Sequence, residues 1–357
     1  MRKRLNPREV QDTRIKEYIN TSSPEWLWEL LPRSATAQET VLKARKTIEN
    51  IMRGKDRRRL LIAGPCSVHS IEETLEYTRS LAETARKVRD RIILIARINI
   101  EKPRTLADWP GLLEDPFMDG SNDIETGRYR TRDLLLRINE TGLPCATEYV
   151  NTSTPQYIGD LVSWSWVGAR TVESQMHKRM ASGLSTGVGF KNTASGDIKS
   201  AVNAVITAKS PCKFPGIKPN GKEATVSTVG NSYGVIILRG GEAPNYGERD
   251  IRAVQKILRA NKLKPQIIID CSHGNSNKNF RNQPKVFRNA VGQMTHNRGI
   301  IGLMLESYIK EGKQDFPPPG RLKKGVSITD SCIDLETTSE LTGFMHRELS
   351  GGDSGCE

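Results

Sequence analysis

The sequence has no long hydrophobic run. Its 357 residues are 36% hydrophobic and 27% charged, and no segment approaches the roughly 18 consecutive apolar residues of a membrane-spanning helix. Residues 2–4 are basic, but no apolar segment follows them, and Glu9, Asp12 and Glu17 come early. These features argue against a secretory signal or a transit peptide. We therefore expect a cytoplasmic protein without a membrane span.

Cysteine is scarce, and its spacing shows no pairing. The chain has six cysteines, which are too few and too irregularly placed for a disulfide framework in a chain of this size. Reduced thiols are therefore expected.

Acidic residues are fewer than basic ones. The 54 Lys and Arg residues against 41 Asp and Glu residues give a formal net charge of +13, with local basic runs at 1–8 and 55–59. This charge suits nucleic-acid binding, a field that attracts small anionic phosphates, or merely a basic surface. The sequence has no zinc-finger spacing, no RNP-like aromatic signature and no basic heptad helix, so nucleic acid is not expected to be the main partner.

The N-terminal segment, residues 1–56, differs in character from the rest. Residues 36–52 place apolar side chains at helical spacing, which predicts an amphipathic helix. Thr36 and Glu39 match a capping box at its start, and Gly54 can end it.

The arm before this helix is rich in large apolar side chains. Trp26, Trp28 and Leu31 are of the kind that a subunit interface buries. We therefore expect a homodimer or homotetramer, with residues 1–56 serving oligomerisation and regulation.

Short apolar runs then alternate with helix-like segments. Most runs are almost continuously apolar, as expected of parallel strands buried on both faces. The expected strands are 60–63, 92–98, 144–150, 164–168, 187–190, 234–238, 266–269 and 300–305. Helical patterns between several of them cover 71–88, 131–141, 198–208 and 248–260. This alternation predicts an α/β fold, a (β/α)8 TIM barrel over residues 57–345.

Two segments lie outside this repeat. Residues 211–229 combine Pro, Gly and alternating residues before the sixth strand, which predicts an inserted β-hairpin. Residues 346–357 are predicted to form a flexible C-terminal tail. Extra loops of a barrel are often functional.

Polar side chains follow nearly every expected strand at its carboxyl end. In a (β/α)8 barrel these ends meet at one rim, where the active site is built. The basic members are Arg97, Lys102, Arg104, Arg170, Lys191 and Arg239. So many cations around one cavity repel one another unless an anionic ligand fills it, and guanidinium groups suit phosphate and carboxylate. The pattern predicts substrates with several negative charges; solvated loop charges are the plainer alternative.

A second group of rim residues has the chemistry of metal ligands. Cys66, His273 and Glu306 follow three different strands, and Asp330 lies just beyond the last one. A thiolate, an imidazole and two carboxylates can bind a divalent transition metal. Their spacing forms no short metal motif, and Cys66 as a small core residue or His273 as a capped loop residue remains an alternative.

An ordered series of motifs gives the sequence a resemblance to a known family. The motifs are Gly-Pro-Cys-Ser (64–67), Glu-Lys-Pro-Arg-Thr (101–105), Gly-Ala-Arg-Thr (168–171), Gly-Phe-Lys-Asn (189–192), Ile-Leu-Arg-Gly-Gly (237–241), Asp-Cys-Ser-His-Gly-Asn-Ser (270–276) and Ser-Ile-Thr-Asp (327–330). Together they resemble the type I 3-deoxy-D-arabino-heptulosonate-7-phosphate (DAHP) synthases, a microbial family that opens the shikimate pathway. The resemblance extends from about residue 12 to about residue 345.

The resemblance implies an enzyme, a transferase that condenses phosphoenolpyruvate with D-erythrose 4-phosphate and water to give DAHP and phosphate. It also implies a divalent metal ion: Mn, Fe, Co or Zn. Two alternatives stay open at this point. One is a related synthase that uses another sugar phosphate, such as arabinose 5-phosphate. The other is a non-catalytic barrel kept as a regulatory or binding subunit.

The resemblance assigns roles to individual residues. The implied metal ligands are Cys66, His273, Glu306 and Asp330. The implied phosphoenolpyruvate-binding residues are Arg97, Lys102, Arg170, Lys191 and Arg239. Arg104 and Thr105 fall on positions that hold erythrose 4-phosphate, and Glu148 and Asp270 fall on cavity positions that support water or ligands. Lys102 is our preferred proton donor, beside Cys66 and His273 as catalytic metal ligands.

Regulation is implied as well. Members of the family are commonly inhibited by Phe, Tyr or Trp, bound between the arm, the hairpin and a neighbouring subunit. The residues on effector positions are Asp12, Gln156, Ser185, Phe214 and Gly216. The absent side chain of Gly216 leaves room for a phenolic hydroxyl, which favours Tyr over Phe; loss of feedback is the alternative.

Overall fold

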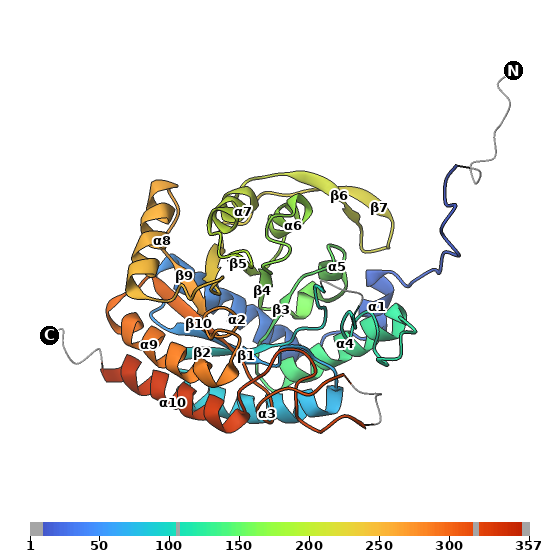
Figure 1. Ribbon diagram of the computed structural model, residues 1–357. Helices are drawn as coiled ribbons and strands as arrows, with labels where there is room; N and C mark the ends of the chain where they lie inside the picture. The colour runs from blue at the N-terminus through green and yellow to red at the C-terminus, as the bar shows by residue number, and fades with distance from the viewer. Residues whose placement is uncertain (1–9, 105–107, 317–320, 352–357) are drawn as a thin grey trace, which may run out of the picture.

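A closed parallel barrel forms the body of the computed structural model, which describes residues 10–104, 108–316 and 321–351 (Figure 1). Its strands are β1 (Arg59–Gly64), β2 (Ile92–Arg97), β3 (Cys145–Glu148), β4 (Trp164–Val167), β5 (Gly187–Lys191), β8 (Gly234–Leu238), β9 (Ile267–Asp270) and β10 (Ile300–Glu306). They pair in the order β1-β10-β9-β8-β5-β4-β3-β2. All the predicted strands are therefore present, and the predicted (β/α)8 barrel is confirmed.

Helices cover the barrel, and those from α3 to α9 lie in the connections between its strands. They are α1 (Pro24–Leu30), α2 (Ala35–Arg53), α3 (Ile71–Val88), α4 (Ile124–Glu140), α5 (Thr154–Ile158), α6 (Gln175–Ala181), α7 (Lys199–Lys209), α8 (Glu248–Ala260), α9 (Gln283–His296) and α10 (Leu335–Gly351). Short 3-10 turns, η2 (Gly159–Leu161) and η3 (Phe280–Asn282), precede β4 and α9. Within the described ranges, no helix is long and apolar enough to cross a membrane.

Two predicted helix starts are corrected. The predicted capping box at Thr36 is wrong, because α2 begins one residue earlier and Ser34 is the N-cap, accepting a hydrogen bond from the Ala37 amide. Helix α4 begins at Ile124, well before the predicted residue 131. Gly127 dilutes its apolar pattern, yet a side chain there would overlap the Leu113 carbonyl oxygen. The start itself is capped by Asp123, whose Oδ1 accepts a hydrogen bond from the Thr126 amide at 3.0 Å.

Helix α2 closes the amino-terminal end of the barrel. Its buried residues Ile48, Ile51 and Met52 pack in one cluster with Leu60 and Trp164, whose side chains lie inside the barrel. Burial of each such aliphatic side chain contributes roughly 2 kcal/mol. Gly54 ends α2 in the left-handed conformation with φ 78°, as predicted.

The predicted insertion is an antiparallel hairpin, β6 (Lys213–Ile217) and β7 (Glu223–Ser227), between α7 and β8. It reaches the N-terminal segment, since the Glu25 amide donates to the Pro219 carbonyl oxygen at 2.9 Å. In the arm, the Trp28 indole donates a hydrogen bond to the Tyr157 carbonyl oxygen, and Leu31 packs on the core. Both side chains therefore have contacts within the same chain. Trp26 stays half exposed.

The predicted start of the C-terminal tail at residue 346 is wrong. Helix α10 continues to Gly351 because Leu341 and Met345 are buried and Leu349 packs against the core, where α10 contacts α9 and α3. Residues 352–357 lie outside the described residues.

Candidate active site

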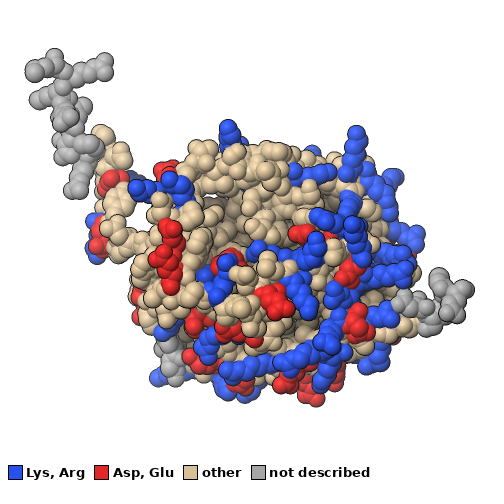
Figure 2. Space-filling view, turned by 180° about the vertical axis from the view of Figure 1, so that it is seen from behind, with Lys and Arg blue, Asp and Glu red and all other residues tan. Residues whose placement is uncertain are grey.

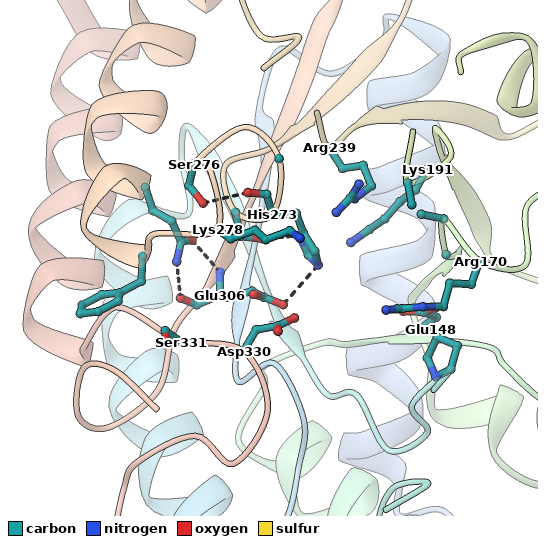
Figure 3. Close-up of a pocket in the computed structure, with 18 of the residues that line it drawn as sticks. Glu148, Arg170, Lys191, Arg239, His273, Ser276, Lys278, Glu306, Asp330 and Ser331 are labelled. Carbon is teal, nitrogen blue, oxygen red and sulfur yellow. Dashed lines mark hydrogen bonds and ion pairs between the residues drawn. The ribbon is translucent and has the colours of Figure 1, made fainter. Parts of the chain in front are cut away.

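The carboxyl ends of the strands surround a cavity of about 530 Å³ (Figure 3). Of the predicted site residues, those that line it are Arg97, Lys102, Glu148, Arg170, Lys191, Arg239, His273, Glu306 and Asp330. Because they lie at the carboxyl ends of seven different strands or in the loops that follow, the barrel closure itself brings them together.

One wall of the cavity holds a cluster of metal-ligand type. Cys66, Glu306 and Asp330 place one ligand atom each within 4.8 Å of one another, and Cys66 Sγ lies 3.5 Å from Asp330 Oδ2. His273 Nε2 lies 3.7 Å from Glu306 Oε1, so the fourth predicted ligand borders the same cluster. Burial and the Glu306 carboxylate raise the pKa of the Cys66 thiol to about 11. A thiolate crowded by two carboxylates needs a cation, so the donor set fits a divalent metal.

His273 is held in one orientation. Its Nδ1 lies 3.0 Å from Asp270 Oδ2 and 2.6 Å from Ser272 Oγ, and Ser272 Oγ donates to Asp270 Oδ1 at 2.6 Å. A proton on Nδ1 therefore faces the carboxylate and leaves the Nε2 lone pair for a ligand role. His273 also has a φ of 57°, which a non-glycine residue rarely adopts and which costs about 1 kcal/mol or more.

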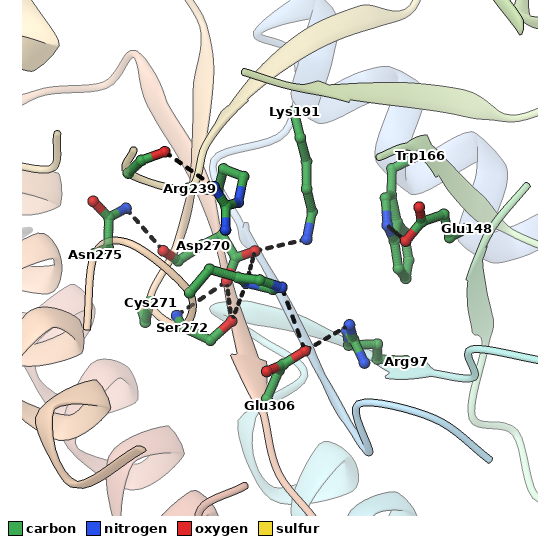
Figure 4. Close-up of polar contacts among 12 residues, drawn as sticks. Arg97, Glu148, Trp166, Lys191, Arg239, Asp270, Cys271, Ser272, Asn275 and Glu306 are labelled. Carbon is green, nitrogen blue, oxygen red and sulfur yellow. Dashed lines mark hydrogen bonds and ion pairs between the residues drawn. The ribbon is translucent and has the colours of Figure 1, made fainter. Parts of the chain in front are cut away.

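Two buried ion pairs form the floor of the cavity (Figure 4). Arg97 Nη2 donates to Glu306 Oε1 at 2.9 Å, and Lys191 Nζ donates to Asp270 Oδ2 at 2.7 Å. Both cations lie over the ring of Trp166, at 5.6 and 5.8 Å from its centroid. Although burial favours the neutral acid, Lys191 and His273 hold the pKa of the Asp270 carboxyl well below its ordinary value.

Asp270 was predicted to contact ligands, but its side chain is fully buried and is not among the cavity-lining residues. It lies beneath Lys191 and His273 and orients both. The prediction that Asp270 lies at the end of a strand is correct. Its side chain points into the protein beneath the cavity, because side chains alternate along a strand.

The opposite wall carries cations without acidic partners. Among the residues that the structure describes, no carboxylate lies within 4.0 Å of Arg170 or Arg239 on this wall, nor of Lys278 and Lys313, which enter the cavity from the loops after β9 and β10. Figure 3 shows Arg170, Lys191 and Arg239 converging on the hollow from the side opposite Glu306 and Asp330. Burial lowers the pKa of Arg239, which remains a cation at neutral pH. This wall is suited to anionic ligands.

Glu148 is fixed between an indole and a glycine. Trp166 Nε1 donates to Glu148 Oε2 at 3.2 Å, and a Cβ at Gly168 would lie 1.9 Å from Glu148 Oε1. A side chain at 168 would therefore displace the Glu148 carboxylate from this position at the rim.

The predicted erythrose 4-phosphate segment is seen in part. Lys102 Nζ donates to the Cys66 carbonyl oxygen at 3.0 Å and lies 3.1 Å from Cys66 Sγ. Arg104 donates to the Trp109 carbonyl oxygen and does not line the cavity. Thr105 lies outside the described residues.

The predicted effector residues belong to several elements. Asp12 is exposed in the arm, Gln156 is in α5, Ser185 is exposed before β5, and Phe214 and Gly216 are in β6. Phe214 is buried, and a Cβ at Gly216 would lie 2.8 Å from Val226 Cγ2. No hydrogen bond or ion pair joins any two of these five described residues.

Sequence reasoning missed several contributors. Gln283 is fully buried and brackets the end of β10, donating to the Glu306 carbonyl oxygen and accepting from the Glu306 amide, both at 3.0 Å. Lys278 and Lys313 reach the cavity from loops after β9 and β10. The sequence shows only that both lysines follow the end of a predicted strand. It does not show whether the loop turns toward the cavity or away from it.

Comparison with known proteins covers nearly the whole chain. A family model described as the DAHP synthetase I family matches residues 35–342. The chain is 45% identical over 344 residues to the Tyr-sensitive phospho-2-dehydro-3-deoxyheptonate aldolase of Salmonella typhimurium, covering 96% of this chain and 97% of that protein. It is 43% identical over 331 residues to the Phe-sensitive enzyme of Escherichia coli (strain K12), covering 92% and 95%. The solved structure of phospho-2-dehydro-3-deoxyheptonate aldolase from Francisella tularensis superposes with a TM-score of 0.92 at 39% identity, covering 94% of this chain and 98% of that one.

Proposed function

The chain belongs to the DAHP synthetase I family, and we propose that the cavity at the carboxyl ends of its strands is where it joins phosphoenolpyruvate to D-erythrose 4-phosphate. This 3-deoxy-7-phosphoheptulonate synthase reaction is the first step of aromatic biosynthesis. The observation that supports this site best is one cavity with unpaired cations on one wall and a cluster of metal-ligand type on the other.

The reaction forms one carbon–carbon bond. C3 of phosphoenolpyruvate bonds to the aldehyde carbon, water adds to C2, and the aldehyde oxygen takes a proton. The tetrahedral C2 then loses phosphate and becomes the keto group of DAHP. Both substrates and both products carry several negative charges, which matches the excess of cations at the cavity.

The basic residues bind and orient phosphoenolpyruvate. Arg170 and Arg239 have no carboxylate to compete for them, so they take the phosphate and carboxylate as bidentate partners. Lys191 and Arg97 are already paired with acids, and they contribute positive charge from the floor. Prepositioned donors of this kind stabilise the charge that develops in the transition state.

The metal-ligand set is Cys66, His273, Glu306 and Asp330. A divalent metal bound there supplies Lewis-acid polarisation of the aldehyde oxygen. The mixed thiolate, imidazole and carboxylate donors suit Mn, Fe, Co or Zn. Asp270 and Ser272 keep His273 Nε2 turned toward Glu306.

Lys102 is the proton donor to the aldehyde oxygen in this proposal. Although burial opposes its charge, the adjacent Cys66 sulfur raises the pKa of Lys102, which therefore carries its proton at neutral pH. We expect Lys102→Met to lower kcat by about 10²-fold or more at unchanged folding. Lys256→Met, on the exposed face of α8, is the matched control. Full turnover by Lys102→Met would exclude this role.

Erythrose 4-phosphate is proposed to enter beside the Lys-Pro-Arg-Thr segment, with Arg104 and Thr105 toward its phosphate. Arg104 is exposed, and among the described residues its guanidinium contacts the Trp109 carbonyl oxygen and, at 4.0 Å, Asp108, so it can turn to a ligand. Turnover with erythrose 4-phosphate but not with arabinose 5-phosphate is the expected result.

The experiment that tests the function is loss of phosphoenolpyruvate absorbance with erythrose 4-phosphate and added manganese, with and without EDTA. We expect loss that needs both substrates and stops with EDTA, with equimolar phosphate released. Folded protein that gives no loss with any divalent metal would identify a non-catalytic barrel instead.

For regulation, we propose feedback by Tyr in preference to Phe. Relatives named Tyr-sensitive and Phe-sensitive both align over nearly the whole chain, at 45% identity to the Tyr-sensitive enzyme and 43% to the Phe-sensitive one. Inhibition at lower Tyr than Phe concentration is expected; the reverse order, or no inhibition, contradicts this proposal.

For assembly, we propose a homodimer or homotetramer in which the arm covers a second copy. Figure 1 shows the arm projecting from the barrel, and it exposes Val10, Tyr18 and Ile19 by 89%, 73% and 78%. Light scattering of the full chain should give a multiple of 39.8 kDa. An Ile19→Asp variant should shift it toward the monomer, and a wild-type monomer would refute the proposal.

For location, we propose the cytoplasm. The five described cysteines are all free thiols, as expected in a reducing compartment. Recovery of the protein with a cytosolic marker on cell fractionation is the expected result.

A further inference from the structure

The opposite end of the barrel carries a second basic pocket. It has a volume of about 430 Å³ and lies where α2 ends and β1, β2, β9 and β10 begin. Its basic lining residues are Arg57, Arg58, Arg59, Arg91 and Arg298. In Figure 1 α2 lies behind the barrel, and the face seen from behind in Figure 2 carries a broad band of Lys and Arg side chains.

The acids in this pocket neutralise only part of its charge. Arg58 pairs with Asp56 at 2.7 Å, and Arg91 pairs with Asp90 at 3.7 Å. Asp90 is also shared with His346 at 2.9 Å.

Three guanidinium groups remain without an acidic partner. Within the described part of the chain, no carboxylate lies within 4.0 Å of Arg57, Arg59 or Arg298, although Glu348 also lines the pocket. The described residues therefore leave one side of the pocket with an excess of positive charge.

Arg59 shows the cost of this arrangement. Its Nε atom is buried without a hydrogen-bond partner among the described residues, and its Nη1 donates to the Arg57 carbonyl oxygen at 3.3 Å. Burial and the neighbouring Arg298 guanidinium lower the pKa of Arg59. Two like charges and an unsatisfied buried donor are unfavourable together unless an anion bridges them.

We propose that this amino-terminal pocket binds a small phosphate-bearing anion, separately from the substrates at the other end. Planar guanidinium forks bind phosphate oxygens in pairs. The volume lies within the range of roughly 300–1,000 Å³ typical of small-molecule sites. Ile51, Met294 and Leu349 add an apolar side that can accept the non-ionic part of such a ligand. A nucleic-acid backbone fits less well, because Asp56, Asp90 and Glu348 interrupt the basic surface.

The test is calorimetric titration of the full, manganese-loaded chain with adenosine 5′-monophosphate, while phosphoenolpyruvate saturates the active site. Inorganic phosphate is titrated in parallel, which separates a monoester site from a free-phosphate site. The variants Arg57→Ala and Arg298→Ala alter exposed side chains and should fold normally. Arg79→Ala, at an exposed position in the middle of α3 and outside the pocket, removes the same charge as a control.

We expect one equivalent to bind, about tenfold more weakly to Arg57→Ala and to Arg298→Ala, and equally to Arg79→Ala and wild type. Equal weakening in all three variants would mean that only net charge matters. Loss in Arg170→Ala alone would place the anion in the active site. Tighter binding of a single-stranded oligonucleotide would make the face a nucleic-acid surface. Each of these outcomes, or no binding by wild type, would overturn the proposal.

Discussion

The two ends of the barrel are both basic, but they use their charge differently. At the carboxyl end, Arg97 and Lys191 are almost completely buried and are held by Glu306 and Asp270. At the amino end, Arg57 and Arg298 are exposed on loops, and the barrel interior beneath is filled by apolar side chains of α2. A (β/α)8 barrel thus separates reactivity from stability along its axis.

The buried ion pairs of the carboxyl end are explained by placement rather than by stability. Removing two charges from water costs about as much as their attraction returns. Their benefit is that Arg97, Lys191 and His273 are already oriented when a ligand arrives. The apolar interior beneath α2, at the amino end, orients no ligand-binding group and contributes burial instead.

The largest effect that would sharpen this contrast is expected at the ligand cluster. Asp330→Asn keeps the shape of the side chain but removes its charge, and we expect kcat to fall by about 10³-fold. Asp334→Asn, which retains an oxygen to cap α10, should keep wild-type activity. Steady-state kinetics with saturating manganese checks this, and an Asp330→Asn enzyme with half the wild-type kcat would contradict it.

The next effect belongs to the amino end. Ile51→Ala opens a cavity beneath α2, and we expect a loss of about 3 kcal/mol in the free energy of unfolding. The kcat of the folded fraction should not change. Leu42→Ala, on the exposed side of the same helix, should cost much less. Equal destabilisation by the two variants would show that α2 does not fill the barrel end as described.

A smaller effect compares one arginine from each end. Arg170→Ala removes a cation that has no acidic partner at the active site, so the KM for phosphoenolpyruvate should rise about tenfold. Arg298→Ala removes the same charge at the other end and should leave this KM unchanged. A similar rise in both variants would mean that the overall positive field, rather than a local contact, governs substrate binding.

The smallest effect distinguishes two buried acids of the carboxyl end. Asp270 has cationic partners, whereas the described part of the chain gives Glu101 only neutral donors, the Thr154 hydroxyl and the amides of Val150 and Asn151. Burial raises the pKa of Glu101 to about 8.

The raised pKa of Glu101 determines how the stability of the protein changes with pH. A folded-state pKa above the unfolded value of about 4.3 means that stability is full below pH 4.3 and is lost as pH rises toward 8. Glu101→Gln should therefore be more stable than wild type by on the order of 1 kcal/mol at pH 8, and should show no such gain at pH 4. Chemical unfolding at the two pH values measures this. A gain that is equal at both would remove Glu101 as the titrating group.

Much of the fold could be predicted because buried parallel strands are almost uniformly apolar. The apolar runs at 60–63 and 234–238 predict their strands directly. In a closed parallel barrel, the residues that follow the strands must then meet at one rim. The ligand set is different, because Cys66 and Asp330 are far apart in the sequence and only the ordered motifs connected them.

The remainder depends on contacts that no local pattern encodes. From the sequence, Trp166 is an ordinary apolar residue of a strand. In the structure its ring lies beneath Arg97 and Lys191, and its indole N–H donates a hydrogen bond to Glu148. From the sequence, Gln283 is a polar residue at the start of a helix. In the structure its side chain forms two hydrogen bonds with the backbone of Glu306. Such roles arise from side-chain direction in the closed barrel.

The hairpin β6–β7 has a consequence for how such an enzyme can diversify. β5 pairs directly with β8, so the chain leaves for the hairpin and returns without interrupting the barrel ladder. The hairpin can therefore change in length and sequence without moving the strand ends that form the rim of the cavity. If the effector site lies at this hairpin, as proposed above, a chimera carrying the hairpin of another family member should keep its turnover and acquire the donor's response to amino acids.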